Sequence, residues 1–327
     1  MTTTFIRGIE NYVRSDDRPA IATVGTFDGI HRGHREIFNR VREQSLRENA
    51  RAMLITFHPH PRVVVTPNSI PLLLTTIEEK EKFVPDFFEG KVLVLDFNHK
   101  MMNMPADQFV RDILIDRVGI KKLIVGYDHA LGKNREGDIP FLRRMGDECG
   151  FEVEVVGPIM DDGNPVSSSR IRRALSGNRF EEAVRLLGHA YAIYGTVERG
   201  IGLGKKLGYP TANVRYSERK LLPYEGVYAC RAQIGGEHKD GMMFIGRNHF
   251  NPDGGVSVEA NLFAFERDIY DEEIVVYPYR WLRENQRFES KEALVEQIGK
   301  DKQAVLNILK EEKRDAPGKG AKSSNYC

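Results

Sequence analysis

Short apolar runs alternate with helical stretches from about residue 20 to about residue 185. Four of these runs have the length of a strand: AIATVG, RAMLITF, KVLVLDF and KKLIVG, which begin at residues 20, 51, 91 and 121. After the first run, residues 34–49 place Ile37, Phe38 and Val41 on one helical face and charged residues on the other. Strands that alternate with helices predict an α/β domain built on a parallel sheet.

The pattern changes after about residue 191. The runs AYAIYGTVERG, GVYACRAQI, GMMFIG, VSVEANLFAF and EEIVVYPY read as strands, and turn residues rather than helices separate them. This half therefore predicts an antiparallel β-barrel or sandwich. A terminal helix is expected from about Lys291, and one of its faces carries Leu294, Ile298, Val305 and Leu309.

These two patterns predict two domains, residues 1–186 and 187–313. Residues 314–327 are small, polar and basic, which is typical of a disordered tail. No internal repeat is visible.

Composition narrows the functional classes. The chain has 327 residues and a formal net charge of +1, so electrostatics favours neither nucleic acid nor an anionic membrane as a partner. No apolar run is long enough to cross a bilayer, and the first residues lack the apolar core of a signal peptide. Cys149, Cys230 and Cys327 lie far apart, so neither a disulfide framework nor a zinc ribbon is indicated. We expect a cytoplasmic protein; nothing in the sequence indicates its oligomeric state.

The segment GTFDGIHRGH follows the first predicted strand and precedes the first predicted helix. Parallel sheets bind ligands at the carboxyl ends of their strands, where Gly25, His58 and Asp128 would lie. Glycines in such a turn let backbone N–H groups approach a phosphate. His31 and His34 are three residues apart at the helix start, so their imidazoles would be neighbours able to hold phosphate oxygens.

Other interpretations of the histidines stay open. One imidazole could cap the helix while the other lies in solvent. Alternatively, His31 and His34 could bind zinc as in a hydrolase, with His58 and His60 of TFHPHP nearby, although no third ligand has a recognisable spacing.

Several motifs of the first half resemble the nucleotidyltransferase superfamily in the form found in bacterial FAD synthetases. GTFDGIHRGH is similar to the H-x-G-H signature, and TFHPHPR, VLDFNHKMMNMPADQFVRDIL, VGYDHALGKNREGD and VSSSRIRRAL follow in the family's order. The resemblance implies a Rossmann-like nucleotidyltransferase domain in which the phosphate of FMN attacks the α-phosphorus of ATP. Catalysis then rests on positioning and charge neutralisation rather than on an enzyme nucleophile.

The same resemblance assigns roles to residues. It implies that His31 and His34 are catalytic and contact the ATP phosphates, and that Asp128 and Asn134 bind flavin. Further residues expected to bind ATP or its phosphates are Gly25, Phe27, Asp28, Gly33, Ser167, Ser168, Ser169, Arg170 and Arg172.

A second glycine-rich stretch, GTVERGIGLGKKLGYPTANV, lies between predicted strands. It fails the Walker pattern because Lys206 stands where serine or threonine should follow Gly-Lys, and by itself it could be a flexible basic hairpin. It resembles the signature of riboflavin kinases, usually fused behind the first domain. The resemblance implies that Thr211 and Asn213 hold Mg²⁺ with ATP. Residues expected to bind this ATP are Gly200, Gly202, Gly204, Lys205, Gly208 and Pro210.

The rest of the barrel half also resembles the kinase. In VSVEANLFAF, Glu259 occupies the place of the family's glutamate and is the candidate base for the ribityl 5′-hydroxyl. Tyr228 of PYEGVYA and Arg283 of WLRENQRF are expected to bind flavin. Two departures concern IGRNHFNP, which lacks Pro-Thr after Gly246, and DIYDEE, where Asp271 replaces a turn glycine.

Together the resemblances imply a bifunctional riboflavin kinase/FMN adenylyltransferase with riboflavin, FMN, FAD and ATP as ligands and Mg²⁺ as cofactor. The altered segment after Gly246 motivates an alternative, an FMN adenylyltransferase whose barrel is a flavin-binding or regulatory module without kinase activity.

Overall fold

The computed structural model describes residues 2–14, 16–66, 71–200, 202–247 and 255–315. The chain divides into two compact units, Met1–Ser168 and Ser169–Cys327. This division lies upstream of the expected boundary at residue 186, because helices α7 and α8 group with the second unit. The expected tail lies almost entirely outside the described residues.

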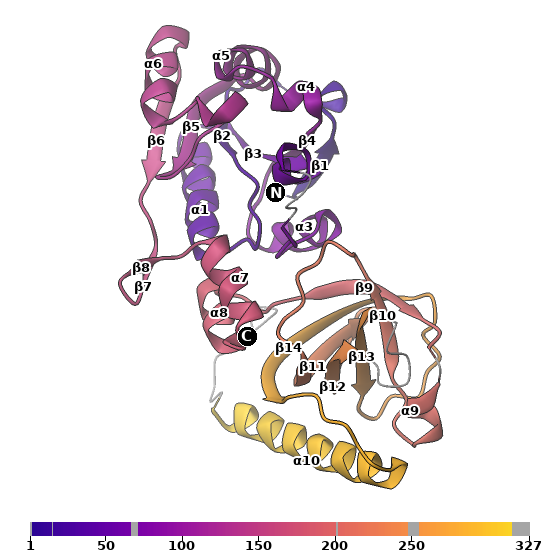
Figure 1. Ribbon diagram of the computed structural model, residues 1–327. Helices are drawn as coiled ribbons and strands as arrows, with labels where there is room; N and C mark the ends of the chain where they lie inside the picture. Colours follow the sequence, from indigo (N-terminus) through magenta and orange to yellow (C-terminus); the bar gives the residue numbers. More distant parts are fainter. Residues whose placement is uncertain (1, 15, 67–70, 201, 248–254, 316–327) are drawn as a thin grey trace. The chain divides into compact units, whose positions relative to one another are not determined.

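The first unit is built on six parallel strands in the order β1-β4-β3-β2-β5-β6 (Figure 1). The strands are β1 (Thr4–Arg7), β2 (Ala20–Val24), β3 (Arg51–His58), β4 (Lys91–Asp96), β5 (Ile120–Gly126) and β6 (Glu152–Val156). The predicted parallel sheet is confirmed, and so are the four central strands. The sequence reasoning missed the two edge strands, β1 and β6.

Helices follow most of these strands. They are α1 (Arg32–Arg47), α2 (Pro61–Val65), α3 (Ile77–Phe83), α4 (His99–Met102), α5 (Ala106–Gln108) and α6 (Ile139–Cys149). A π-helix, η3 (Phe109–Val118), continues from α5. Short 3₁₀ turns are η1 (Ile9–Asn11), η2 (Val84–Asp86) and η4 (Lys133–Arg135), and β7 (Met160–Asp161) pairs with β8 (Asn164–Pro165) as a small hairpin.

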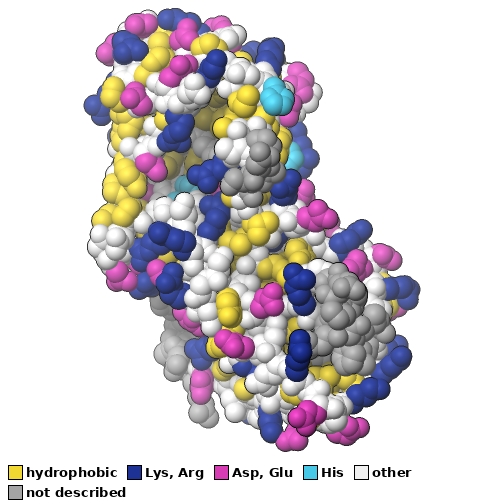
Figure 2. Space-filling view, in the orientation of Figure 1, with side chains coloured by type: hydrophobic (Ala, Val, Ile, Leu, Met, Phe, Trp, Pro, Cys, Tyr) yellow, Lys and Arg dark blue, Asp and Glu magenta, His cyan; other side chains and the backbone are white. Residues whose placement is uncertain are grey.

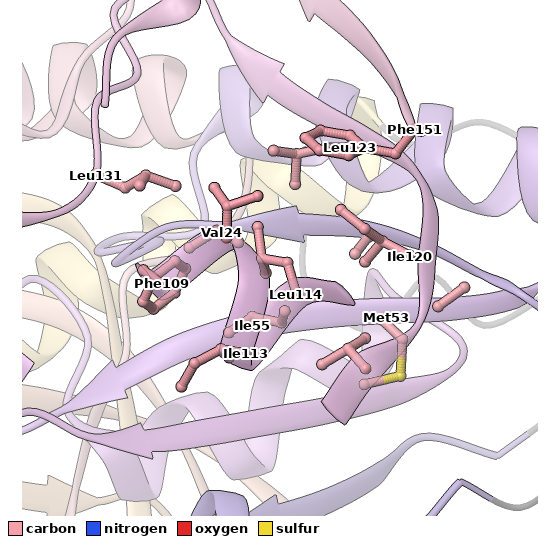
Figure 3. Packing of buried hydrophobic residues seen from close by; sticks show 14 of the residues in the cluster. Val24, Met53, Ile55, Phe109, Ile113, Leu114, Ile120, Leu123, Leu131 and Phe151 are labelled. Atoms are coloured by element: carbon pink, nitrogen blue, oxygen red, sulfur yellow. The ribbon is translucent and has the colours of Figure 1, made fainter. Parts of the chain in front are cut away.

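Alternation along the strands gives the sheet two hydrophobic faces. Val24 of β2 belongs to one buried hydrophobic cluster. Ile21 of the same strand lies on the opposite face of the sheet and belongs to a second cluster. The first cluster also contains Phe109 and Leu114 of η3, and Figure 3 shows its side chains gathered between the strands and this helix. The second cluster contains Phe38 of α1. Because both faces are covered, each central strand contains a short run of consecutive apolar residues, which made these strands visible in the sequence.

The strand order reverses beside β2, which pairs with β3 on one side and with β5 on the other. At such a switch point the connections from adjacent strands lead in opposite directions and leave a crevice at the carboxyl ends. Gly25 follows β2 there, and Tyr127 follows β5. The topology therefore brings GTFDGIHRGH and the loop with Asp128 to one edge of the sheet.

The second unit contains a closed antiparallel barrel in the order β10-β13-β12-β11-β14-β9. Its strands are β9 (Ile193–Glu198), β10 (Ala212–Tyr216), β11 (Gly226–Ile234), β12 (Glu237–Arg247), β13 (Val256–Leu262) and β14 (Glu273–Arg283). The predicted barrel is confirmed, and β10 is a strand that the sequence reasoning did not assign. The helices of this unit are α7 (Ser168–Ser176), α8 (Phe180–Leu187), α9 (Leu203–Lys206) and α10 (Lys291–Asp315).

The terminal helix α10 covers an apolar patch on the barrel. Val305 and Leu309 are buried against Ala229 and Met242, and Ile298 packs at the edge of the same cluster. Three of the four residues expected on the apolar face therefore pack in this cluster, whereas Leu294 is half-buried outside it. On the molecular face in Figure 2, acidic and basic side chains are interspersed, in keeping with the balanced net charge.

Candidate active sites

The turn between β2 and α1 holds an unusual backbone. Phe27 and Ile30 adopt positive φ angles of 45° and 44°, and Gly29 between them has a φ of 91°. Positive φ is uncommon for residues with a side chain, and costly for bulky ones such as Phe and Ile. Such conformations persist where the surroundings hold them, and they cluster at functional sites. The surrounding residues therefore hold this turn in a conformation that is typical of functional sites.

Asp28 holds this turn in place. Its carboxylate accepts hydrogen bonds from the backbone N–H groups of Leu74 (3.2 Å) and Thr75 (2.9 Å), and its side chain is buried. The Ser168 hydroxyl donates to the carbonyl oxygen of Asp28 at 2.9 Å. The structure thus gives Asp28 and Ser168 a role in shaping the loop, in addition to the ATP contacts expected of them.

His31 and His34 stand at the start of α1, as their spacing predicts. His31 is the N-cap residue, and the two imidazole rings stack with centroids 3.6 Å apart and planes 20° from parallel. The ring of Phe27 meets His34 edge-on at 5.3 Å. A Cβ on Gly33 would come within 3.3 Å of the His31 ring, so glycine here leaves space for the stacked pair.

His34 is held in its neutral form. Burial lowers its pKa well below the usual range, and the charges of His31 and Lys80 lower it further. Its Nδ1 is buried and has no hydrogen-bond partner among the described residues. A neutral imidazole can donate a hydrogen bond from one nitrogen, and two stacked imidazoles disfavour double protonation.

Lys80 of α3 is a site residue that the sequence reasoning missed. Its side chain is buried, and Nζ donates a hydrogen bond to the carbonyl oxygen of Thr26 at 2.6 Å. A signal was present in the sequence: Thr76 and Glu79 form a capping box, which predicts a helix start. Helical spacing from the buried Ile77 would then have turned Lys80 inward.

The loop after β5 carries the expected flavin residues on the surface. Asp128 and Asn134 are both exposed, and Asn134 has a φ of 53°. Arg135 donates to the carbonyl oxygen of Asp128 at 3.0 Å, which ties the two ends of the loop together. Tyr127 is 41% exposed beside Asp128, so this loop presents an aromatic ring and a carboxylate at the sheet edge.

The serine and arginine motif spans the boundary between the two units. Ser168 begins α7, and Arg170 donates from Nε to Glu182 of α8 at 3.2 Å. Part of the Arg170 guanidinium is thus engaged within the second unit. The phosphate contacts expected of Ser167, Ser169, Arg170 and Arg172 stay predictions.

A pocket of about 520 Å³ lies along α1 and residues 85–89. Its charged lining consists of Arg32, Arg35, Arg42, Glu36, Asp86 and Glu89, three cations and three anions. Equal numbers of both signs give no net attraction for a triphosphate. The turn at Gly25–His34, and not this pocket, therefore remains the predicted phosphate site.

The alternative of a zinc site at His31 and His34 requires a third protein ligand nearby. No group of three or more His, Cys, Asp or Glu side chains that could hold a metal occurs within the described residues. His60 instead accepts a hydrogen bond from the backbone of Arg62 and caps α2.

The second candidate site lies where β10 and β13 pair. Glu259 stands opposite Asn213 in this register. Its carboxylate accepts hydrogen bonds from the hydroxyls of Thr211 and Ser257, both at 3.3 Å. A carboxylate and two hydroxyls thus gather at one end of the strand pair, with Asn213 opposite the carboxylate residue. Oxygen groups of this kind suit a hard cation such as Mg²⁺ and an acid–base role.

The glycine-rich stretch packs closely on this cluster. A Cβ on Gly200 would lie 2.3 Å from the amide nitrogen of Asn213, so only glycine fits without a shift. The stretch was expected between strands; in the structure it runs from β9 to the unassigned strand β10 and contains the short helix α9. Lys205 lies exposed in α9, while Gly202, Gly208 and Pro210 flank this helix on the exposed side.

Two residues expected to bind flavin have structural partners. Tyr228 is fully buried, and its hydroxyl donates to the carbonyl oxygen of Tyr224, so in this conformation its side chain presents no surface to a ligand. Arg283 makes a bidentate ion pair with Asp301 of α10, with Nη2–Oδ2 and Nε–Oδ1 distances of 2.6 and 2.9 Å. Flavin binding by both residues stays a prediction.

The two departures from the kinase pattern differ in outcome. Asp271 takes the glycine-like conformation with a φ of 64°, and its N–H donates to Val197 at 2.8 Å, so the turn forms without glycine. The segment after Gly246 lies largely outside the described residues. At Gly246 itself a Cβ would meet the side chain of Asn285 at 2.1 Å.

Comparison with known proteins identifies both units. The FAD synthetase family matches residues 13–170, and the riboflavin kinase family matches residues 187–309. These matches define a chain with two transferase modules.

Full-length relatives carry the same pair of modules. A bifunctional riboflavin kinase/FMN adenylyltransferase of Pseudomonas fluorescens is 38% identical over 90% of this chain and 94% of its own length. The Escherichia coli protein of the same description is 33% identical over 90% of this chain and 95% of its own length. This chain belongs to the family of bifunctional riboflavin kinase/FMN adenylyltransferases.

A solved structure supports the same architecture. It is described as a macrolide-efflux protein from Streptococcus pneumoniae and matches with a TM-score of 0.82 and 28% identity over 94% of this chain and 99% of that one. Within the described residues of this chain, no helix has the length and apolar character needed to cross a membrane.

Proposed function

We propose that this chain makes FAD from riboflavin in two ATP-dependent steps, one in each unit. The barrel unit phosphorylates riboflavin to FMN, and the sheet unit transfers the adenylyl group of ATP to FMN with release of pyrophosphate. The observation that carries this proposal is the presence of both family domains in one chain, with relatives that match it almost from end to end.

In adenylyl transfer, a phosphate oxygen of FMN bonds to the α-phosphorus of ATP while the bond to the bridging oxygen breaks. Pyrophosphate leaves with the electron pair, so the protein has to align the reactants and neutralise the growing negative charge. We assign this role to His31 and His34. A neutral His34 can donate a hydrogen bond to a phosphate oxygen without carrying a proton into the reaction. Gly25, Phe27 and Gly33 shape the turn that brings backbone N–H groups to the same phosphates.

In the kinase step, the 5′-hydroxyl of the ribityl chain loses its proton to Glu259, its oxygen bonds to the γ-phosphorus, and ADP leaves. The hydrogen bonds from Thr211 and Ser257 keep this carboxylate oriented on β13. Glu259 is partly exposed rather than buried, which leaves it accessible to a substrate hydroxyl.

Mg²⁺ fits the oxygen groups around Glu259. Thr211 and Asn213 would hold the ion together with ATP phosphates, and Gly200 and Gly204 keep the adjoining loop close to them. When bound, Mg²⁺ supplies positive charge that neutralises the phosphate oxygens during transfer.

Chromatography of the flavins formed by the purified protein tests the proposal. Riboflavin, ATP and Mg²⁺ should yield FMN first and then FAD, and a chelator should abolish the kinase step. If FAD appears only when FMN is added, the kinase assignment fails, and the alternative of an adenylyltransferase with a non-catalytic barrel replaces it. The match of residues 187–309 to riboflavin kinase favours the two-step reading.

A further inference from the structure

Lys80 places a buried positive charge beside the turn between β2 and α1. Its side chain is 6% exposed, and its Nζ donates a hydrogen bond to a neutral group, the carbonyl oxygen of Thr26, at 2.6 Å. Burial lowers the pKa of Lys80, whereas the carboxylate of Asp28 acts in the opposite direction. Burying an ammonium group is costly in free energy, so a lysine in such a place calls for a reason.

The position of Lys80 suggests that reason. Thr26 directly precedes Phe27, the first residue with positive φ in the turn. Burial is the main cause of the lowered pKa of His34, followed by the charge of His31, and the charge of Lys80 adds to both. Lys80 on α3 and His34 on α1 therefore act on the same short segment from two helices.

We propose that Lys80 is a further positioning residue of the adenylyl-transfer site, which fastens the Thr26 carbonyl and adds a fixed positive charge near the histidine pair. This inference rests on the proposed function of the first unit. A charge in a buried site interacts strongly with negative charge that develops nearby, because little water screens it. Lys80 thus favours the departure of pyrophosphate and, after burial and His31, helps to keep His34 neutral.

Three substitutions separate the charge from the hydrogen bond. Lys80→Met removes both, Lys80→Gln keeps an N–H donor without the charge, and Lys80→Arg keeps the charge with a different shape. Lys82→Met is the matched control, since Lys82 lies exposed on the same helix. Riboflavin kinase activity, measured on the same preparations, reports whether the second unit is intact, and thermal unfolding reports whether the first unit is folded.

We expect Lys80→Met and Lys80→Gln to lower kcat for FAD formation from FMN by about a hundredfold, the usual effect of losing one group that stabilises transition-state charge. Lys80→Arg should lose less than tenfold, and Lys82→Met should change nothing. In an NMR titration, the pKa of His34 should rise in Lys80→Met and Lys80→Gln. The unaltered chain must make FAD from FMN and ATP; its failure would count against the proposed function itself.

Given an active unaltered chain, two results would overturn the role of Lys80. One is a Lys80→Gln protein with unchanged kcat, which would make the residue a neutral anchor. The other is an equal loss in Lys80→Gln and Lys80→Arg with an unchanged pKa of His34, which would show that only its shape matters. If Lys80→Met does not fold, the comparison of Lys80→Gln with Lys80→Arg decides.

Discussion

His129 lies next to the exposed carboxylate of Asp128, in the loop that follows β5. Its Nε2 is buried and has no hydrogen-bond partner among the described residues. Burial, and secondarily the charge of Arg135, lowers the pKa of His129 to about 4. The imidazole is therefore neutral in the folded protein at pH values where an unfolded chain would protonate it.

This shift predicts how acid affects the first unit. Between pH 6.5 and about 4 the unfolded state binds a proton that the folded state does not, so the free energy of unfolding falls as the pH falls. His129→Phe should reduce this fall between pH 7 and pH 5. Hydrogen-exchange mass spectrometry of peptides from β5 in increasing urea would measure it. An unaltered pH dependence in the variant would contradict the assigned pKa; His34, shifted in the same direction, contributes equally in both proteins.

At the residue scale, the spacing of His31 and His34 predicts that the two side chains are neighbours at a helix start, which the structure confirms. The stacking of the rings could not be read from the spacing. The role of Asp28 could not be predicted, since its partners at residues 74 and 75 are remote in sequence. For Lys80, the capping box of α3 indicates an inward-facing side chain, but its contact with Thr26 could not be predicted, because it exists only after α3 packs against the turn.

At the scale of elements, one ion pair joins the terminal helix to the barrel. Arg283 at the end of β14 and Asp301 of α10 have side chains that are 18% and 7% exposed, and Gln297 donates to Asp301 at 2.8 Å. Removing one partner leaves a largely buried charge unpaired. The contact therefore fastens α10 over the apolar patch it covers.

Asp301→Ala should lower the free energy of unfolding of the barrel unit by about 3 kcal/mol, the usual cost of breaking a buried pair. Trp281 is the only tryptophan in the sequence and lies in β14, so its fluorescence follows this unit in a urea titration. Glu296→Ala is the matched control, because Glu296 pairs with Lys300 in solvent on the same helix. Equal changes in both variants would show that the Arg283 pair has no special role.

The elements missed by the sequence reasoning share a physical cause. The edge strand β1 contains no fully buried residue, and β6 carries glutamates at two of its five positions. An edge strand is covered less completely than a central one, so its sequence does not need a continuous apolar run. The strand β10 alternates apolar and polar residues over five positions only, and it directly follows the glycine-rich stretch, which reads as a loop.

At the scale of the whole molecule, the change of pattern near residue 190 predicts two architectures, and the structure contains both. The boundary expected at residue 186 stays a prediction, because the compact units divide after Ser168 whereas the riboflavin kinase family match begins at residue 187. Helices α7 and α8 look like a continuation of the α/β pattern, yet Phe180 of α8 packs on Tyr228 of the barrel with ring centroids 5.5 Å apart. Periodicity describes an element's own faces and not which neighbour covers them.

As proposed above, adenylyl transfer and the kinase step use two separate active sites. The most direct measurement incubates His34→Ala and Glu259→Gln with riboflavin, ATP and Mg²⁺ and resolves the flavins over time. His34→Ala should accumulate FMN at an unchanged rate while FAD formation falls by about two to three powers of ten. Glu259→Gln should form almost no FMN from riboflavin and should still convert added FMN to FAD. Loss of both activities in both variants, with the proteins folded, would contradict separate sites.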